Sequence, residues 1–387
     1  MILDFTRRLY IIKHSDSEQN GQVKRKAAGD KRRGNGQATG NVTEHRGGGA
    51  RASRRGVDAM TVGEIRGAGA VVWRWASAAE ARVEIEVLLV HRTKVRKADR
   101  GTGQPATGDG QREAKLDWSF PKGKLPSAEK GARRRHPMRT AVREVRQETG
   151  LEIRLGRHLG TAEYRTKAHP KAFLYWAADV VKDHGFTHNE VDEIKWMPLA
   201  EARRALTFVS DQKLLDVLEK TTLPTAPVIL LRGASSSAVQ QPSGDGDPDL
   251  DQRDARDARS LAKLLRCFGT LPVLTSDASH CMRTVAPYAK HTNAPISVRE
   301  ELSCSGFDPE VASRIVREHI RQGSGAIVCS HHEELPQLAR RIFGMGVLGD
   351  PLGAAPPLKP AEFLIFHTHQ DQVVAWERSS PKWNASK

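Results

Sequence analysis

The most constraining feature of this sequence is a helical segment that carries acidic residues on one face. The segment reads RTAVREVRQETG over residues 139–150. Glu144 and Glu148 are four positions apart and Gln147 lies between them, so at 3.6 residues per turn the three side chains share one face. Gly150 occupies the position of a helix C-cap. Carboxylates paired in this way can hold a hard cation such as Mg²⁺, which would neutralise a polyphosphate and activate a water.

A glycine-rich turn precedes this helix and completes a longer pattern. The turn reads WSFPKGK over residues 118–124, with Gly123 between two lysines, and Glu129 follows six positions later. Together the turn and the helix resemble the Nudix box, the signature of the Nudix hydrolases. The resemblance implies an α/β/α sandwich with a mixed sheet, a Mg²⁺ or Mn²⁺ cofactor, and hydrolysis of a phosphoric anhydride.

The resemblance also assigns roles to individual residues. Glu144 and Glu148 are the expected catalytic residues. An acidic segment before Trp196 supplies a further candidate ligand, Glu190, with Glu193 as its neighbour. The expected metal ligands are therefore Gly123, Glu144, Gln147, Glu148 and Glu190. Basic side chains near the turn can donate charge-assisted hydrogen bonds to phosphate oxygens, and the expected substrate contacts are Arg92, Lys122 and Lys124.

The sequence departs from the Nudix pattern at two places. Residues 130–142 form a thirteen-residue spacer between Glu129 and Arg143, longer than the family spacing. Gln147 stands where the family has a glutamate that usually binds metal. An amide oxygen can still coordinate, but it carries no charge, so metal binding should be weaker. Two hypotheses stay open: a metal-dependent hydrolase, and a catalytically weakened or inactive nucleotide-binding regulatory module.

The chain is long and basic. Its 387 residues have room for two domains, and its net charge is +15. Residues 1–59 hold 13 Lys and Arg against 6 Asp and Glu, with little apolar content. We expect this segment to be a disordered basic tail, with ordered sequence beginning after Met60. A basic chain suits anionic partners such as nucleotides, and we expect nucleic-acid binding only through the tail.

Several features favour a cytoplasmic protein. No apolar run approaches the roughly 18–20 residues that span a bilayer. Residues 1–13 lack the apolar centre of a signal peptide. The four cysteines show no C-x-x-C spacing, which favours buried, reduced thiols. We therefore expect a reduced cytoplasmic protein that does not enter a membrane.

Residues 60–222 are expected to form the first domain, a Nudix-like α/β/α sandwich. Periodicity predicts two helices after the box helix, at residues 198–205 and 211–220. It predicts strands at residues 67–74, 83–92, 158–165, 171–181 and 190–196.

Residues 223–387 are expected to form the second domain. Strands alternate here with helices, which predicts a mostly parallel, doubly wound α/β sheet. The expected strands are residues 228–232, 271–276, 325–331, 362–367 and 372–378. The expected helices are residues 250–265, 281–291, 309–322 and 334–343.

The second domain resembles the histidine phosphatase (phosphoglycerate-mutase-like) superfamily in a degenerate form. That family has a strand ending in Arg-His-Gly, whose histidine is phosphorylated, whereas this strand ends in Arg232 and Gly233. His280 stands in place of a second family arginine, Glu301 matches the family acid and His331 matches the second active-site histidine. Because glycine cannot form a phosphohistidine, we expect no catalysis here. The residues of the degenerate phosphatase pocket, which could still bind an anion, are Arg232, His280, Glu301 and His331.

The order of the two domains is similar to that of the long MutT-type proteins of actinobacteria. This family hydrolyses nucleoside triphosphates, oxidised guanine nucleotides among them, and dinucleoside polyphosphates. The resemblance therefore implies a nucleotide substrate from one of these classes.

Overall fold

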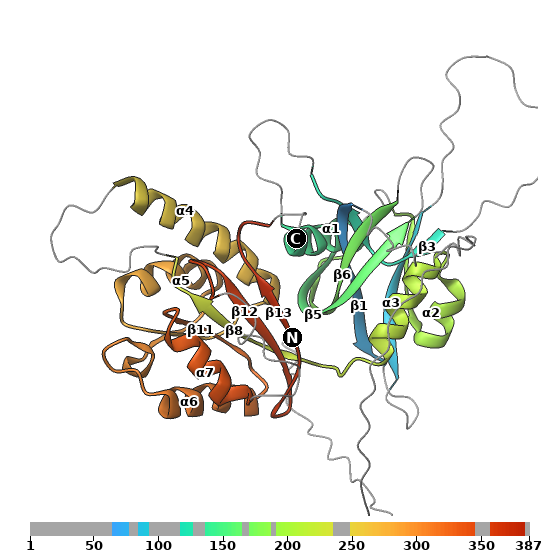
Figure 1. Cartoon of the computed structure of the whole chain (residues 1–387). Helices are drawn as coiled ribbons and strands as arrows, with labels where there is room; N and C mark the ends of the chain where they lie inside the picture. The colour runs from blue at the N-terminus through green and yellow to red at the C-terminus, as the bar shows by residue number, and fades with distance from the viewer. Residues whose placement is uncertain are drawn as a thin grey trace, which may run out of the picture. The chain divides into compact units, whose positions relative to one another are not determined.

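The computed structural model of the chain describes residues 64–76, 84–92, 117–126, 136–164, 170–186, 191–234, 248–344 and 357–383 (Figure 1). Residues 60–387 form one compact unit. The expected tail at residues 1–59, the acid Glu129 and the candidate ligand Glu190 lie outside the described residues. The expected domain boundary between residues 222 and 223 stays a prediction.

Among the described residues, seven strands form the first sheet, in the order β3-β2-β1-β6-β5, with β4 paired to β1 and β7 paired to β2. β1 pairs parallel with β6 and antiparallel with β2 and β4, so the sheet is mixed as expected. The strands are β1 (Ile65–Trp75), β2 (Ile85–Arg92), β3 (Asp117–Ser119), β4 (Lys122–Lys124), β5 (Leu151–Tyr164), β6 (Lys171–Asp183) and β7 (Glu193–Pro198).

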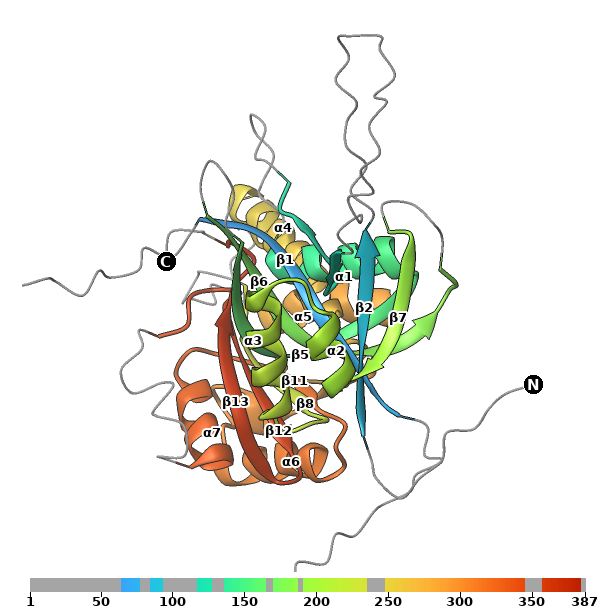
Figure 2. The same ribbon diagram turned by 90° about the vertical axis from the view of Figure 1, so that its right-hand side faces the viewer.

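Helices cover both faces of this sheet. They are α1 (Pro137–Thr149), α2 (Leu199–Ala205) and α3 (Val209–Glu219). Successive side chains of a strand point to opposite faces. In β1, Ala70 and Val72 belong to the apolar cluster of α1, whereas Val71 and Trp73 belong to the cluster of α2 and α3. Figure 2 shows α2 and α3 on one side of the strands and α1 on the other. The expected α/β/α sandwich is confirmed.

Local sequence explains where the acidic helix α1 begins and ends. His136 is its N-cap, and its Nδ1 accepts a hydrogen bond from the backbone N–H of Met138 at 3.3 Å. Pro137 occupies the first helical position, where a missing N–H costs nothing. Gly150 ends the helix in the left-handed conformation at φ 74°, which glycine adopts without strain. The helix therefore begins two residues before the expected segment and ends where the sequence indicates.

Six strands form the second sheet within the described residues, in the order β10-β9-β11-β8-β12-β13. Strands β8 to β11 run parallel, and the last two run antiparallel. The strands are β8 (Ala226–Arg232), β9 (Val273–Thr275), β10 (Ile296–Val298), β11 (Ala326–Ser330), β12 (Phe363–His369) and β13 (Gln372–Ser379). All were expected except β10.

Helices also cover both faces of the second sheet, which confirms the doubly wound arrangement. Ile229 and Leu231 of β8 belong to the cluster of α4 and α5, and Val228 and Leu230 belong to that of α6 and α7. The helices are α4 (Pro248–Leu265), α5 (Ser279–Thr292), α6 (Pro309–Arg321) and α7 (Glu334–Phe343), with short 3₁₀ turns η1 (Arg266–Phe268) and η2 (Glu300–Leu302).

A partly buried carboxylate connects the two sheets. Glu377 of β13 accepts hydrogen bonds from the backbone N–H of His158 at 2.7 Å and from Trp176 Nε1 at 3.2 Å. It also forms an ion pair with His367 Nε2 at 2.8 Å. Burial raises the pKa of this carboxyl, but its interactions with His367 and His158 together lower it below its usual value. Partners on both sheets therefore hold one partly buried charge.

Two further expectations concerned the burial of the cysteines and membrane-spanning segments. All four cysteines are described and free; three are buried, whereas Cys304 is exposed. The prediction of buried thiols is therefore wrong for Cys304, which lies in a surface turn after η2. None of the helices in the described ranges has the length and apolar content to cross a bilayer.

Candidate active site

The turn and the acidic helix meet at Gly123 and Glu144. Gly123 lies in β4 opposite Ala68 of β1. A Cβ atom built on Gly123 would lie 1.9 Å from Cδ of Glu144 and 2.2 Å from each of its carboxylate oxygens. The Glu144 side chain is 12% exposed. Only glycine lets this carboxylate lie against the backbone of the turn, which explains the residue type at position 123.

Glu148 is the more buried of the two acids on α1. Its side chain is 5% exposed and forms an ion pair with Arg92. Its Oε2 accepts a hydrogen bond from the backbone N–H of Lys122 at 3.0 Å. Burial raises the pKa of Glu148, and the positive charge of Arg92 offsets this effect only in part. A cation beside Glu148 would stabilise its ionised form.

Arg143 links the acids of α1 to the turn. It forms an ion pair with Glu144, its Nη1 donates to Gln147 Oε1 at 3.1 Å, and its Nη2 donates to the carbonyl of Lys124 at 3.4 Å. Sequence reasoning assigned Arg143 no role. Its spacing of one and four residues from Glu144 and Gln147 is the signal that could have found it.

The three expected phosphate-binding residues differ in their surroundings: Arg92 and Lys122 are hydrogen-bonded within the protein, whereas Lys124 faces solvent. Arg92 Nη1 donates to Ser119 Oγ at 2.9 Å, and Lys122 Nζ donates to the same oxygen at 2.8 Å. Lys122 also lies over the ring of Tyr164 at 5.2 Å. Lys124 is exposed. Two of the three cations are therefore anchored within the protein around one hydroxyl, and their contacts with substrate phosphates stay predictions.

A buried acid behind Lys122 was missed in the sequence. Asp211 of α3 is fully buried, and its Oδ1 accepts a hydrogen bond from the Tyr164 hydroxyl at 2.5 Å. The hydroxyl of Tyr175 lies 2.8 Å from that of Tyr164. Burial raises the pKa of Asp211, and the charge of Lys122 acts in the opposite direction. These hydrogen bonds fix the ring of Tyr164, over which Lys122 lies.

The oxygen donors of α1 fit a hard divalent cation. Three oxygen-bearing side chains share one face of α1. The Glu144 carboxylate lies against Gly123, and the Glu148 carboxylate accepts from the backbone of Lys122. The Gln147 amide oxygen accepts from Arg143, which is paired with Glu144. Mg²⁺ prefers such ligands and few of them, with water completing its shell. The carbonyl of Gly123 lies in the ladder with β1, so its role as a metal ligand stays a prediction. Gln147 is exposed and brings no charge, and the expected weakening of metal binding stays a prediction.

The degenerate phosphatase pocket is assembled only in part. The rings of His280 and His331 lie 4.8 Å apart, centroid to centroid, at the carboxyl ends of the parallel strands. Arg232 donates to the carbonyl of Leu358 at 2.5 Å, and burial lowers the pKa of its guanidinium. Glu301 lies in η2. Among the described residues, its side chain forms no hydrogen bond or ion pair with the other three pocket residues.

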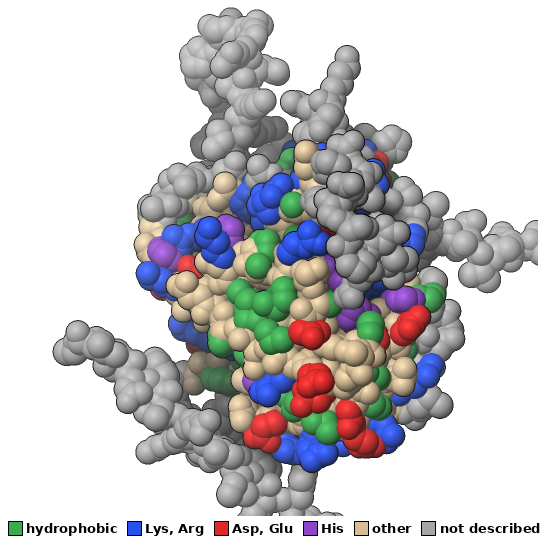
Figure 3. Space-filling view, turned by 90° about the vertical axis from the view of Figure 1, so that its left-hand side faces the viewer, with side chains coloured by type: hydrophobic (Ala, Val, Ile, Leu, Met, Phe, Trp, Pro, Cys, Tyr) green, Lys and Arg blue, Asp and Glu red, His purple; other side chains and the backbone are tan. Residues whose placement is uncertain are grey.

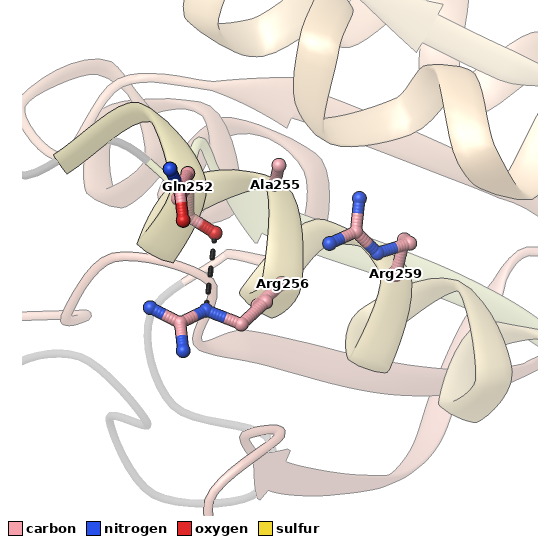
Figure 4. Close-up of a pocket in the computed structure, with 4 residues that line it drawn as sticks. All are labelled: Gln252, Ala255, Arg256 and Arg259. Carbon is pink, nitrogen blue, oxygen red and sulfur yellow. Dashed lines mark hydrogen bonds between the residues drawn. The ribbon is translucent and has the colours of Figure 1, made fainter. Parts of the chain in front are cut away.

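Two surface features carry no expected site residue. A hollow of about 340 Å³ on α4 is lined by one helical face, Gln252, Ala255, Arg256 and Arg259 (Figure 4). Figure 3 shows a face on which described Lys and Arg side chains lie mostly above an apolar patch and Asp and Glu side chains lie mostly below it. The net positive charge of the chain is therefore not spread as one basic surface over that face.

Comparison with known families agrees with both halves of this description. Residues 68–218 match the family model of the NUDIX domain, and residues 228–303 match that of the histidine phosphatase superfamily (branch 1). An 8-oxo-(d)GTP phosphatase of Mycolicibacterium smegmatis is 28% identical over 284 residues, which cover 71% of this chain and 79% of that relative.

Two solved structures among the matches each cover about two fifths of this chain. A C. elegans Ap4A hydrolase binary complex is 22% identical, with a TM-score of 0.29, and covers 40% of this chain and 96% of its own. The protein histidine phosphatase SixA, complexed with tungstate, is 18% identical, with a TM-score of 0.33, and covers 40% of this chain and 97% of its own. The matches to the two family models and to the 8-oxo-(d)GTP phosphatase identify a NUDIX domain, followed by a domain of the histidine phosphatase superfamily, and a hydrolase that acts on phosphoric anhydrides.

Proposed function

We propose that this enzyme hydrolyses the phosphoanhydride bonds of nucleoside triphosphates in a reaction that depends on Mg²⁺ or Mn²⁺, and that oxidised guanine nucleotides are its preferred substrates. The observation that carries the proposal is the placement of the Glu144 carboxylate against Gly123, with the Glu148 carboxylate beside the same turn. The similarity to an 8-oxo-(d)GTP phosphatase over most of both chains supports the choice of substrate. The free cysteines fit a cytoplasmic location.

The side chains of the site have two tasks. The acidic side chains would hold a cation, and the basic side chains would hold the phosphates of the substrate. A divalent cation, when bound, supplies positive charge and Lewis acidity to the phosphoanhydride. Glu144 and Glu148 would hold it, and Arg143 fixes the direction of the Glu144 carboxylate through their ion pair. Lys124 is exposed at the turn and can reach phosphate oxygens from solvent.

Arg92 has a second task in this arrangement. It keeps the buried Glu148 carboxyl from taking up a proton, because its ion pair opposes the effect of burial on the Glu148 pKa. An ionised carboxylate is the form that binds a cation. Arg92 therefore prepares the site, and it remains close enough to the turn to contact substrate phosphates, since its Nη2 reaches the Lys122 carbonyl at 3.5 Å.

The test is a substrate panel with the purified full chain, first dialysed against a chelator. Oxidised dGTP, dGTP, ATP and a dinucleoside tetraphosphate are each supplied with Mg²⁺, with Mn²⁺ and without metal. We expect turnover only with metal, and kcat/KM about tenfold or more higher for oxidised dGTP than for dGTP. Preferential turnover of the dinucleoside tetraphosphate would replace the proposed substrate class. Equal turnover without metal would contradict the proposed cofactor.

The second candidate function is a regulatory module that binds nucleotides without hydrolysing them. The neutral, exposed Gln147 at a position where the family has a metal-binding glutamate favours it. The two functions differ in one readout. Nucleotide binding without product, at saturating metal and over hours, would favour the module.

A further inference from the structure

The degenerate phosphatase pocket brings together three side chains that are typical ligands of transition metals. His280 and Cys281 lie in the first turn of α5, and His331 follows β11. One ligand atom from each of the three lies within 4.8 Å of the others. The three therefore converge from two elements that are distant in the sequence.

Gly233 leaves room for this cluster. A Cβ built on Gly233 would lie 2.7 Å from Cδ2 of His280 and 3.3 Å from Sγ of Cys281. The larger side chain that the phosphatase pattern has here would collide with His280 and Cys281. The absence of a side chain at position 233 therefore leaves the space in which His280 and Cys281 lie.

We propose that His280, Cys281 and His331 bind a transition metal such as Zn²⁺ at the carboxyl ends of strands β8 and β11. Imidazole and thiolate are ligands that Zn²⁺ prefers over oxygen-seeking cations such as Mg²⁺. Tetrahedral Zn²⁺ sites have bonds of about 2.0–2.3 Å, which place ligand atoms about 3.3–3.8 Å apart. Movements of the ligand atoms by about 1 Å, through side-chain rotation, would bring them to bonding distance of one ion. The fourth position would be left for water or another ligand.

Hydrogen bonds orient one of the histidines for this role. His331 Nε2 lies 3.2 Å from Ser276 Oγ, and Ser276 is fully buried. Ser276 donates in turn to Ser303 at 3.2 Å, and Ser303 donates to Asp277 at 2.6 Å. Histidines that bind metals commonly use their second nitrogen in such a bond. This chain of hydroxyls leaves Nδ1 of His331 for the metal.

Cys281 also interacts with its neighbours in and around the cluster. Hydrogen bonding from the Cys329 thiol and from His280 lowers the pKa of the Cys281 thiol to about 5, against the effect of burial. The partnership with Cys281 raises the pKa of His280. The site is independent of the proposed nucleotide hydrolysis, because the two sites use different residues and different classes of ligand atom.

Co²⁺ titration of the full chain in excess Mg²⁺ tests the proposal. Mg²⁺ occupies the oxygen ligands of the Nudix site, and only a Co²⁺–thiolate bond gives a charge-transfer absorption in the near ultraviolet. We expect one equivalent of Co²⁺ to produce this absorption and one equivalent of Zn²⁺ to remove it. No thiolate absorption in the wild-type protein would overturn the proposal.

Variants identify the ligands. Cys281→Ala should abolish the thiolate absorption, and His331→Gln should weaken Co²⁺ binding at least about tenfold. Cys304→Ser and Cys267→Ala, which change an exposed and a buried thiol outside the cluster, should bind Co²⁺ as the wild type does. Unchanged Co²⁺ binding in both Cys281→Ala and His331→Gln would contradict the assignment. A cooperative thermal unfolding transition shows that each variant is folded. If Cys281→Ala does not fold, His331→Gln still tests the assignment.

Discussion

The carboxylate of Glu144 occupies the space that any side chain at Gly123 would need. This contact joins the turn to the acidic helix and fixes where a cation and a polyphosphate could meet. Because Gly123 lies opposite Ala68 in the ladder between β4 and β1, the turn cannot shift without loss of strand pairing. The geometry of the site therefore depends on the absence of one methyl group.

Gly123→Ala should displace Glu144 and reduce kcat/KM about 10²-fold, because misplacing a catalytic group by about 1 Å can cost that much. The measurement is steady-state hydrolysis at saturating metal. Gly156→Ala is the matched control, since a Cβ there would meet its nearest atom at an ordinary 3.4 Å. Equal activity of the two variants would show that the contact has no catalytic importance.

Gln147→Glu should tighten Mg²⁺ binding about tenfold and raise turnover at limiting metal. The added carboxylate brings a negative charge to the site, and Arg143, which already contacts Gln147, can partner it. The activation constant for Mg²⁺ gives the measurement. Gln337→Glu adds the same charge on an exposed position of α7 and should change nothing. No response to Gln147→Glu would favour the regulatory module.

Arg92→Met should move the acidic limb of the pH–activity profile to higher pH. Arg92 opposes the effect of burial on Glu148, so without it the pKa of Glu148 rises further and the ionised carboxylate is lost at higher pH. The profile of kcat/KM at saturating metal reports the shift. Arg146→Met, which removes an exposed arginine on α1, is the control. An unmoved limb in Arg92→Met would contradict the role given to this ion pair.

His136 should make the stability of the enzyme sensitive to acid. Burial lowers the pKa of His136 from 6.5 to about 4, so the folded protein keeps it neutral. Below pH 6.5 the unfolded chain binds a proton that the folded protein does not, and stability is lost as the pH falls towards 4, by up to about 3 kcal/mol.

His136→Asn tests this linkage, because asparagine also caps helices but does not titrate. Urea unfolding at pH 7.5 and pH 5 should show a smaller loss of stability in the variant than in the wild type. His291→Asn, which replaces an exposed histidine of α5, should behave as the wild type. Parallel losses in the wild type and His136→Asn would exclude His136 as the source of acid sensitivity.

Much of the fold could be predicted because its elements have clear periods and terminal residues. The long strands β1 and β6 bury both faces and form continuous apolar runs, and Gly150 marks the end of α1. The strand β10 was missed because three residues, Ile296–Val298, are too few to show an alternation. Its pairing with β9 comes from the tertiary fold.

The acidic part of the candidate site was predictable because its pattern stands in one stretch of sequence. Gly123, Glu144 and Glu148 belong to such a pattern. The bond between Tyr164 and Asp211 joins residues 47 positions apart, and the cluster of Cys281 and His331 depends on two strands that happen to end side by side. Contacts of this kind follow from topology, which no local pattern specifies.

The most direct test of the account is hydrolysis of oxidised dGTP by Glu144→Gln and Glu148→Gln at saturating Mg²⁺. The change keeps the size of each side chain and removes the charge that holds the cation, so both variants should lose about 10²-fold or more in kcat/KM. Glu152→Gln, an exposed acid just beyond α1, should remain within about twofold of the wild type. Near-normal activity of both site variants would place the catalytic centre elsewhere and contradict the account.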